Sequence, residues 1–389
     1  MKTNYLDHLL EELVKSEIPG CSLHVMQRGE LRYEGYFGCA DVQAKTPVTE
    51  ASVFRMASMS KVPLFTALMI LVEQGSILFT DPMSRFFPEW KAMRKAVKKP
   101  DGTTDVVPTD GPITVKDVMM MSCGLPYCLQ NVESDDVTVQ SMVKCMQPLW
   151  ERGHFTLREE IRALSGAVLA FEPGTRWMYG FSSELAAGIL EAVCGKPAND
   201  VLAELLFKPL KMNETRPHYF GTIKERMVTL YSKREDGTYV PAQCALDDKH
   251  NPGERFETGN PRLFSTGRDF SRLMQMLANG GELDGVRVMG RKTIDLMRTN
   301  TLNAAQLKDF QDDYNAGYGY GYGVRTLLDK AAGNNNGALG SFGWTGGFGT
   351  WCEADPEDGV SIVFMFNQFP WTDGSLHARI RTAAYGIVK

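Results

Sequence analysis

The stretch Phe54–Gly75 reads FRMASMSKVPLFTALMILVEQG and joins a Ser-x-x-Lys pattern to an apolar run that predicts a helix. The serine of the pattern is Ser58 and the lysine is Lys61. Residues three apart lie on one face of a helix, one turn apart, so the two side chains are expected to meet where the helix begins. Unpaired backbone N–H groups and the positive end of the helix dipole favour a developing anion at that place.

The surroundings of Lys61 favour chemistry on Ser58. Lys61 lies against the apolar part of the helix, where burial disfavours the charged form and makes an amine a usable base. A serine and a lysine in this arrangement are typical of an acyl-transfer site. The pattern is short, and a second copy, Ser141-Met-Val-Lys144, occurs further on without a long apolar run behind it. The context therefore favours Ser58 as the nucleophile.

Length and composition limit the class of protein. At 389 residues the chain exceeds what one hydrophobic core usually covers, so two lobes are expected. The 43% apolar and 23% charged residues are typical of a globular protein. A net charge of −5 argues against a nucleic-acid partner. The one basic run, residues 91–99, is interpreted as a solvated helix or loop.

The N-terminus and the cysteines indicate the compartment. The apolar residues of the first helix are interrupted by Asp7, Glu11 and Glu12, so no signal peptide is predicted. No run approaches the ~18 apolar residues that span a bilayer. The eight cysteines are scattered without a Cys-x-x-Cys, and the six histidines are isolated. We therefore expect a cytoplasmic protein with unpaired thiols, no metal site, no cofactor and no membrane partner; its oligomeric state stays open.

The pattern of elements predicts one sheet completed by both ends of the chain. Expected strands cover residues 21–28, 31–39, 320–328, 349–354 and 360–367, and helices near the C-terminus cover 269–278 and 377–387. Between them, helices without strands are expected at residues 115–121, 137–146, 157–169, 183–193 and 199–207. This order predicts a sheet domain of residues 1–80 and 225–389 with a mainly helical domain, 81–224, inserted in it.

Two regions carry alternatives. GYGYGYG, residues 317–323, has the glycines of a phosphate-binding loop, but a strand follows it where such a loop needs a helix. A glycine-rich entry to a strand is therefore preferred over nucleotide-dependent chemistry. The polar, turn-rich region 239–259 leaves open whether it folds over the site.

Three stretches together point to a family. They read FRMASMSK at residues 54–61, FEPGTRWMYG at 171–180, and FGWTGGFGTWCEADPEDG at 342–359. In this order they resemble the nucleophile segment, the tyrosine segment and the Lys-Thr-Gly segment of the serine β-lactamase and penicillin-binding protein superfamily. The likeness is greatest to its class C-like branch with the family VIII carboxylesterases. Residues 113–125 and 263–277 are also similar, so the resemblance covers nearly the whole chain.

The resemblance implies a fold and a mechanism. The fold would be a β-lactamase-like α/β (α+β) fold, an antiparallel sheet flanked by helices with an inserted all-helical lobe. Ser58 would form an acyl-enzyme, and Lys61 and Tyr179 would share the proton transfers, with either one as the base. The backbone N–H groups of Ser58 and Gly347 would form the oxyanion hole.

Departures from the family pattern bear on the substrate. Lactamases of this branch carry an asparagine two residues after the tyrosine, where this chain has Phe181. The cation of their Lys-Thr-Gly box is replaced by Trp344, which Thr345 and Gly346 follow. Both changes remove polar recognition. The four residues are predicted to bind substrate, and the two aromatic rings favour a neutral, apolar small-molecule ester.

The sequence thus predicts a serine hydrolase that acts as a carboxylesterase. The first alternative is a β-lactamase or D-amino-acid amidase or peptidase with the same Ser-Lys-Tyr site. A second alternative, from another class, is a ligand-binding relative that retains the fold without catalysis. No Gly-x-Ser-x-Gly occurs, so an α/β-hydrolase nucleophile has no candidate.

Overall fold

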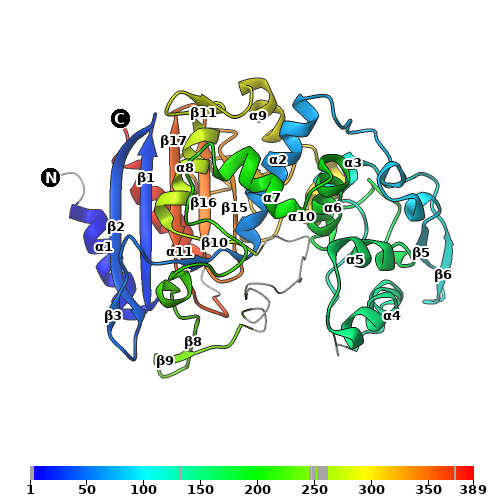
Figure 1. Cartoon of the computed structure of the whole chain (residues 1–389), viewed down its shortest axis with the longest axis horizontal. Coiled ribbons are helices and arrows are strands. Elements are labelled where there is room, and N and C mark those ends of the chain that lie inside the picture. The colour runs from blue at the N-terminus through cyan, green and yellow to red at the C-terminus, as the bar shows by residue number, and fades with distance from the viewer. Residues whose placement is uncertain are drawn as a thin grey trace.

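The two ends of the chain lie side by side in one antiparallel sheet (Figure 1). The computed structural model describes residues 4–128, 130, 133–244, 247, 251, 262–371 and 374–389. The strand order is β13-β14-β15-β16-β17-β1-β2-β3, and each neighbouring pair is antiparallel. The bounds are β1 Gly20–Gln27, β2 Glu30–Asp41, β3 Thr46–Pro47, β13 Tyr318–Tyr320, β14 Arg325–Leu327, β15 Phe342–Thr345, β16 Trp351–Asp355 and β17 Val360–Met365. The sheet predicted from the sequence is confirmed.

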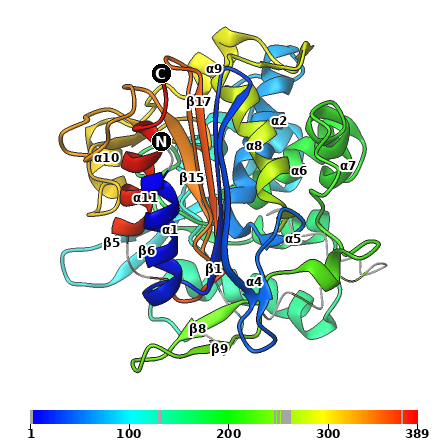
Figure 2. The ribbon, with the colours of Figure 1, turned by 90° about the vertical axis from the view of Figure 1, so that its left-hand side faces the viewer.

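Helices cover both faces of this sheet (Figure 2). Helices α1 (Asn4–Ser16) and α11 (Ser375–Tyr385) pack on one face, where their leucines and isoleucines meet Trp351 and Phe364 in one apolar cluster. Helix α8 (Gly267–Ala278) packs on the other face, against β1, β16 and β17. The first strands join through Arg28 and Gly29, both at positive φ, as a tight hairpin needs.

Helix α2 (Lys61–Glu73) runs through the centre of the molecule. Residues 61–71 are all buried, so the helix is apolar on every side except for Lys61 and Thr66. Gly75 follows the helix at φ 70°, the left-handed conformation that glycine adopts at a helix C-terminus. The helix that the first stretch of sequence predicts is confirmed.

The inserted lobe is mainly helical. Its α-helices are α3 Val115–Met119, α4 Val137–Arg152, α5 Leu157–Leu164, α6 Ser182–Cys194 and α7 Ala198–Leu202. Side chains cap three of them: Thr114 caps α3, Asp136 caps α4 and Thr156 caps α5. The division into residues 1–80 with 225–389 and residues 81–224 stays a prediction.

The expectation of an all-helical lobe is wrong in one respect, because a three-stranded sheet lies in it. Strand β5 (Arg94–Lys98) pairs antiparallel with β6 (Thr104–Pro108) and parallel with β7 (Val168–Leu169). The basic run, expected as a helix or loop, is thus a strand of a solvated hairpin. The expectation was wrong because charge alone does not distinguish a strand from a loop. The helix expected over 157–169 ends at Leu164, where Ser165-Gly166 disfavours further helix.

A second correction concerns residues 320–328, which were expected to form one strand. β13 ends at Tyr320 and the chain turns through residues 321–323 before β14 begins. Gly323 has φ 82°, and a Cβ there would lie 2.1 Å from the Phe65 ring of α2. The glycine repeat therefore provides a strand and a hairpin turn packed on the central helix, and a side chain at position 323 would not fit.

The remaining elements are short. Strand β4 (Phe54–Arg55) pairs with β10 (Phe264–Ser265), β8 (Tyr231–Lys233) with β9 (Tyr239–Pro241), and β11 (Glu282–Leu283) with β12 (Val286–Arg287). Helices α9 (Arg291–Met297) and α10 (Ala304–Phe310) precede β13. In the polar region 239–259, residues 245–246, 248–250 and 252–259 lie outside the described residues. Whether this region folds over the site therefore stays open.

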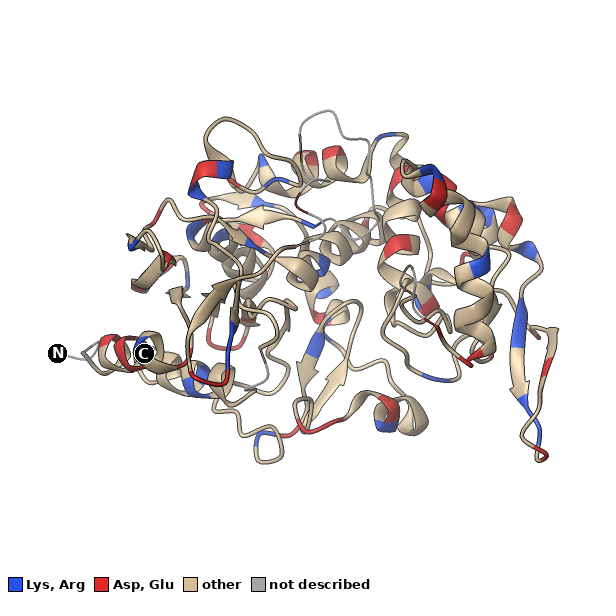
Figure 3. Cartoon of the chain, turned by 90° about the horizontal axis from the view of Figure 1, so that it is seen from below, with Lys and Arg blue, Asp and Glu red and all other residues tan. Residues whose placement is uncertain are grey.

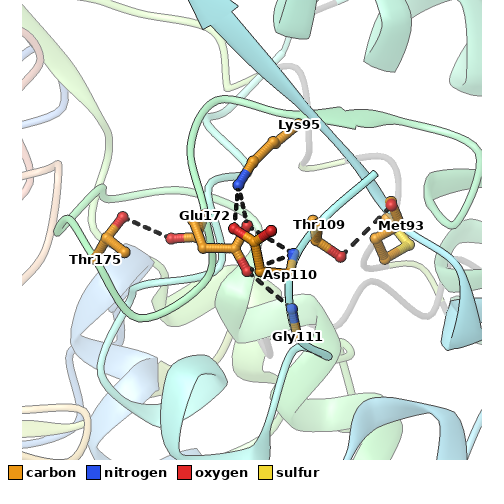
Figure 4. Close-up of polar contacts among 7 residues, drawn as sticks. All are labelled: Met93, Lys95, Thr109, Asp110, Gly111, Glu172 and Thr175. Carbon is orange, nitrogen blue, oxygen red and sulfur yellow. Dashed lines mark hydrogen bonds and ion pairs between the residues drawn. The ribbon is translucent and has the colours of Figure 1, made fainter. Parts of the chain in front are cut away.

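One carboxylate ties the small sheet to the segment that leads to Tyr179 (Figure 4). Glu172 accepts hydrogen bonds from the backbone N–H groups of Asp110 and Gly111, each at 3.0 Å. It also pairs with Lys95 of β5 at 2.7 Å. Because Glu172 belongs to the 171–180 stretch, these contacts fix where that stretch begins.

We predict that Glu172→Ala lowers the free energy of unfolding by about 1–2 kcal/mol, because two N–H groups lose a charged acceptor. The control is Asp105→Ala, on the same hairpin, which breaks an exposed pair with Lys99 and is expected to cost at most about 0.5 kcal/mol. Urea unfolding of the three proteins measures both changes. Equal losses in the two variants would contradict the assigned role of Glu172.

Candidate active site

Ser58 lies on a short 3₁₀ turn, η1 (Ala57–Ser60), between β4 and α2. Ala57, immediately before it, has φ 46°, which is unfavourable for a residue with a Cβ. Such strain persists only where the surrounding structure imposes it, and it is concentrated at functional sites. The backbone at Ser58 is therefore held in one unusual conformation.

Lys61 is the first residue of α2, and its side chain is completely buried. Its Nζ donates a hydrogen bond to Ser58 Oγ at 3.1 Å, so the structure brings together the two residues that the spacing pairs. Burial lowers the pKa of Lys61, but Tyr127, Tyr179 and Glu184 raise it, and the net pKa lies above its ordinary value. Desolvation therefore does not by itself leave Lys61 neutral, and which of Lys61 and Tyr179 is the base stays a prediction.

Tyr179 comes from the inserted lobe and lies over the Lys61 amine. Lys61 Nζ lies 5.0 Å from the centroid of the Tyr179 ring and 5.8 Å from that of Tyr127. From the other side, Trp344 Nε1 donates a hydrogen bond to the Tyr179 hydroxyl at 3.4 Å. The structure thus gathers Ser58, Lys61, Tyr179 and Trp344 from three distant parts of the chain.

The backbone around Tyr179 is held from both sides. Met178 N donates to Met121 O at 2.8 Å within the lobe. Trp177 N donates to the carboxylate of Asp309, on α10, at 3.1 Å. These contacts leave the Tyr179 ring little freedom relative to the nucleophile.

The turn after β15 approaches the nucleophile segment closely. A Cβ on Gly346 would lie 2.3 Å from Met56 O, two residues before Ser58, so only glycine fits. Gly349 N donates to Gly346 O at 2.9 Å and closes the turn. Gly347 has no atom within 4 Å of the place where a Cβ would stand. Gly347 therefore faces open space at the tip of a turn held against the nucleophile segment.

The predicted substrate-binding aromatics are nearly buried. Trp344 is 8% exposed, and its ring lies 5.7 Å from that of Tyr179 and 5.3 Å from that of Tyr320. Phe181 is 7% exposed and lies 5.5 Å from the Tyr127 ring. Thr345, at the end of β15, is partly exposed. Contact of these side chains with a substrate stays a prediction.

A cavity of about 200 Å³ opens beside Ser58. Its walls include Ser58, Tyr127, Glu184, Cys244, Arg262 and Phe348. Neither Phe181 nor Trp344 is part of its wall, although Tyr127 separates the cavity from Phe181. The nearest space for a substrate is therefore more polar than the two aromatic residues suggest.

Of these six wall residues, sequence reasoning predicted only Ser58; Tyr127, Glu184 and Arg262 are among those it missed. Glu184 could have been found as an acid that directly precedes the apolar run of α6. Tyr127 follows the 113–125 stretch and has no signal of its own. Arg262 gives no sequence signal, because it reaches the site only through the pairing of β10 with β4.

Two buried acids, Glu184 and Glu160, lie behind the site. Glu184 is 4% exposed and accepts a hydrogen bond from Ser183 Oγ at 2.8 Å; burial raises its pKa, although Lys61 lowers it. Glu160, on α5, is 5% exposed. Burial and the neighbouring Glu184 raise the pKa of Glu160 to about 8. Glu160 therefore keeps its proton at neutral pH.

Over the described part of the chain, no group of three or more His, Cys, Asp or Glu side chains could hold a metal ion. None of the helices described is long and apolar enough to cross a membrane. No two of the eight cysteines form a disulfide, as their spacing predicts. In Figure 3 the acidic and basic residues are interspersed along the ribbon of both lobes.

Comparison with known proteins supports the resemblance over the whole length. A family model described as Beta-lactamase matches residues 6–386. Esterase EstB of Burkholderia gladioli is 25% identical over 399 residues, which cover 98% of this chain and 94% of EstB. Protein Rv1367c of Mycobacterium tuberculosis (strain ATCC 25618 / H37Rv) is also 25% identical, over 91% of this chain and 86% of its own.

Solved structures with the same fold include EstCE1, described as a hydrolase with promiscuous acyltransferase activity. It superposes with a TM-score of 0.81 at 21% identity, covering 99% of this chain and 98% of EstCE1. A family VIII carboxylesterase gives a TM-score of 0.75 at 19% identity, covering 100% and 98%. The β-lactamase-like fold expected from the motifs is confirmed.

We predict that Glu160 makes the protein less stable as the pH rises from about 5 to about 8. In this window the unfolded chain, with a glutamate pKa near 4.5, loses a proton that folded Glu160 keeps up to about pH 8. The free energy of unfolding therefore falls with pH, by at most about 1.4 kcal/mol per pH unit from this group. Glu160→Gln is expected to flatten the profile measured by urea unfolding at pH 5, 6, 7 and 8.

The control for this profile is Glu159→Gln on the same helix. Its pKa is lowered by hydrogen bonds from Thr156 and Arg152, so its contribution is complete above the unfolded pKa and constant over this window. A profile of Glu160→Gln that runs parallel to the wild type would contradict the prediction.

Proposed function

The chain belongs to the Beta-lactamase family of serine hydrolases, and from this membership we propose that it is a carboxylesterase acting through Ser58, Lys61 and Tyr179. The observation that carries the proposal is the 3.1 Å hydrogen bond from Lys61 Nζ to Ser58 Oγ at a strained backbone position. The relative EstB is named an esterase, and the two chains align over nearly their whole lengths. This likeness supports an ester as the substrate.

In the proposed mechanism Ser58 Oγ attacks the ester carbonyl and the alcohol leaves. The Lys61 amine donates a hydrogen bond to Ser58 Oγ and orients it for attack. The same amine lies over the Tyr179 ring, 5.0 Å from its centroid, so Tyr179 lies next to this pair. The Ser58 proton passes to Lys61 or Tyr179, with either one as the base, and returns to the oxygen of the leaving alcohol. Water hydrolyses the acyl-enzyme by the same steps in reverse order.

The negative charge on the carbonyl oxygen would be bound by backbone N–H groups of Ser58 and Gly347. Gly347 suits this role because the space beside it is open and its turn is held to Met56, close to the nucleophile. Removing one such donor costs about 3–4 kcal/mol in a comparable site. Gly346 and Thr345 would border the same space.

The aromatic wall would favour an ester over a β-lactam. Trp344 uses its only polar atom on the Tyr179 hydroxyl and offers the substrate an apolar face. Phe181, at the position of the asparagine that lactamases of this branch carry, offers no hydrogen bond to an amide. A substrate whose amide must be hydrogen-bonded would lose that contact here.

We predict that Ser58→Ala lowers kcat/KM for p-nitrophenyl butyrate by about 10⁴-fold or more, because no acyl-enzyme forms. The control is Ser141→Ala in the second Ser-x-x-Lys copy. Ser141 lies on α4, where its hydroxyl accepts from Val168 N at 2.8 Å, and its loss should leave the rate within about twofold. Mass spectrometry after treatment with an active-site serine phosphonate should find the adduct on Ser58.

Three outcomes would overturn parts of this proposal. Equal rates for wild type and Ser58→Ala would exclude the mechanism. No phosphonate adduct on Ser58 would favour a non-catalytic ligand binder. Nitrocefin turnover faster than that of every ester tested would favour a β-lactamase or a D-amino-acid amidase or peptidase.

We further predict that Tyr179→Phe lowers kcat by about 10²–10⁴-fold with little change in thermal stability. The ring contacts with Trp344 remain in this variant, so only the hydroxyl is tested. The matched control is Tyr322→Phe, whose ring stacks on Phe79 at 4.3 Å and should leave kcat within about twofold. A Tyr179→Phe rate close to that of the control would leave Lys61 as the base.

A further inference from the structure

A second cation lies in the wall of the cavity beside Ser58, and no carboxylate of the described residues pairs with it. Two arginines line this cavity, Arg55 and Arg262. Arg55 is paired with the Asp247 carboxylate through two hydrogen bonds of 2.9 and 2.7 Å. Over the described part of the chain, Arg262 forms no ion pair within 4.0 Å, and its buried Nη1 has no hydrogen-bond partner.

The position of Arg262 is fixed by the nucleophile segment itself. The next residue, Leu263, donates its N–H to Ser60 Oγ at 3.1 Å and accepts from Met56 N at 3.0 Å. Strand β10 then pairs with β4. The backbone at Arg262 is therefore tied to residues on either side of Ser58, and its guanidinium stays in the same cavity as the Ser58 hydroxyl.

An unpaired cation in such a place is costly for the protein alone. Buried guanidinium groups are normally matched by a carboxylate with good hydrogen-bond geometry. The two nearby acids, Glu184 and Glu160, influence Arg262 electrostatically but lie beyond ion-pair distance. Glu160 is also protonated at neutral pH, as shown above. With Lys61 beside it, the site carries a positive charge that its acids do not fully balance.

We propose that Arg262 binds a carboxylate of the substrate, so that the esters cleaved at Ser58 carry an acid group near the scissile bond. The guanidinium offers paired N–H donors that match a carboxylate. The cavity of about 200 Å³ accommodates a short chain or one ring between the two groups. Acylated hydroxy acids and monoesters of short dicarboxylic acids are substrates of this kind. The inference rests on the proposed function and names its substrate class.

The proposal differs from the expectation that Trp344 and Phe181 gave. Those residues indicate that the Lys-Thr-Gly position supplies no cation, and the sequence therefore favours a neutral ester. In the structure, Arg262 supplies a cation from another segment, just before β10, on the wall of the cavity beside Ser58. A substrate carboxylate would thus be bound by Arg262 and not by a residue at the Lys-Thr-Gly position.

The test compares isosteric substrates that differ in one charge. The pair 3-acetoxybenzoate and 3-acetoxybenzamide places the charge on the leaving group, and monoethyl glutarate and ethyl glutaramate place it on the acyl group. For wild type, kcat/KM should be about 10- to 100-fold higher for the anion of at least one pair, the effect of a charge-assisted hydrogen bond. Most of the difference is expected in KM.

In Arg262→Gln this preference should fall to within about threefold, while kcat/KM for the neutral member changes by less than about threefold. Arg262→Lys should keep an intermediate preference, because it retains the charge without the paired donors. The control is Arg234→Gln, on the exposed turn between β8 and β9, which removes one positive charge outside the cavity. Its preference should equal that of the wild type.

Several results would overturn the proposal. Equal kcat/KM for both members of both pairs in wild type does so without any variant, even if the Arg262 variants fail to fold. An equal loss on anionic and neutral substrates in Arg262→Gln would make Arg262 a positioning residue for Lys61 and Glu184. If the phosphonate labels Ser58 and the anionic and neutral esters are cleaved with equal kcat/KM, this inference fails while the proposed function stands. If Ser58→Ala keeps full activity, the proposed function fails first.

Discussion

The hydrogen bonds on Met56, two residues before the serine, hold the site together. Met56 N donates to Leu263 O at 3.0 Å, and Met56 O accepts from Thr350 Oγ1 at 3.1 Å. The first bond brings in the segment before β10 that carries Arg262, and the second brings in the turn that carries Gly347. With Ala57 held at φ 46° next to it, the serine lies close to the place where both elements bond to Met56. The positions of Ser58, Arg262 and Gly347 depend on this junction.

The third component, Tyr179, comes from the inserted lobe and is placed by a different set of contacts. Glu172 holds the start of its segment to the β5–β6 hairpin, and Asp309 of α10 holds Trp177 beside it. The hydrogen bond from Trp344 to the Tyr179 hydroxyl then joins the lobe to the sheet. The geometry around Lys61 is therefore sensitive to how the inserted lobe packs against the sheet.

The features that depend only on neighbouring residues could be predicted from the sequence. The spacing of Ser58 and Lys61, the apolar run behind them and the hairpin turn at Arg28-Gly29 require no knowledge of the rest of the fold, and the structure agrees with them. The strand β5 could not be recognised, since a solvated two-stranded hairpin has no apolar face to give alternation. The turn inside residues 320–328 was missed because it depends on contact between Gly323 and Phe65 of a distant helix. Tyr127 and Arg262 were missed for the same reason, whereas Glu184 had a signal in the sequence as an acid beside the apolar run of α6.

The pKa of Lys61 shows that the Ser-x-x-Lys motif alone does not determine the electrostatics of the site. From the sequence, burial alone acts on the amine and lowers its pKa. In the folded chain Tyr127, Tyr179 and Glu184 surround it, and their sum reverses the sign. Lys61 and Arg262, which forms no ion pair with the residues that the structure describes, bring positive charge to the site from two separate segments. The electrostatics of the site are therefore a property of the assembled fold, which the motif residues alone do not convey.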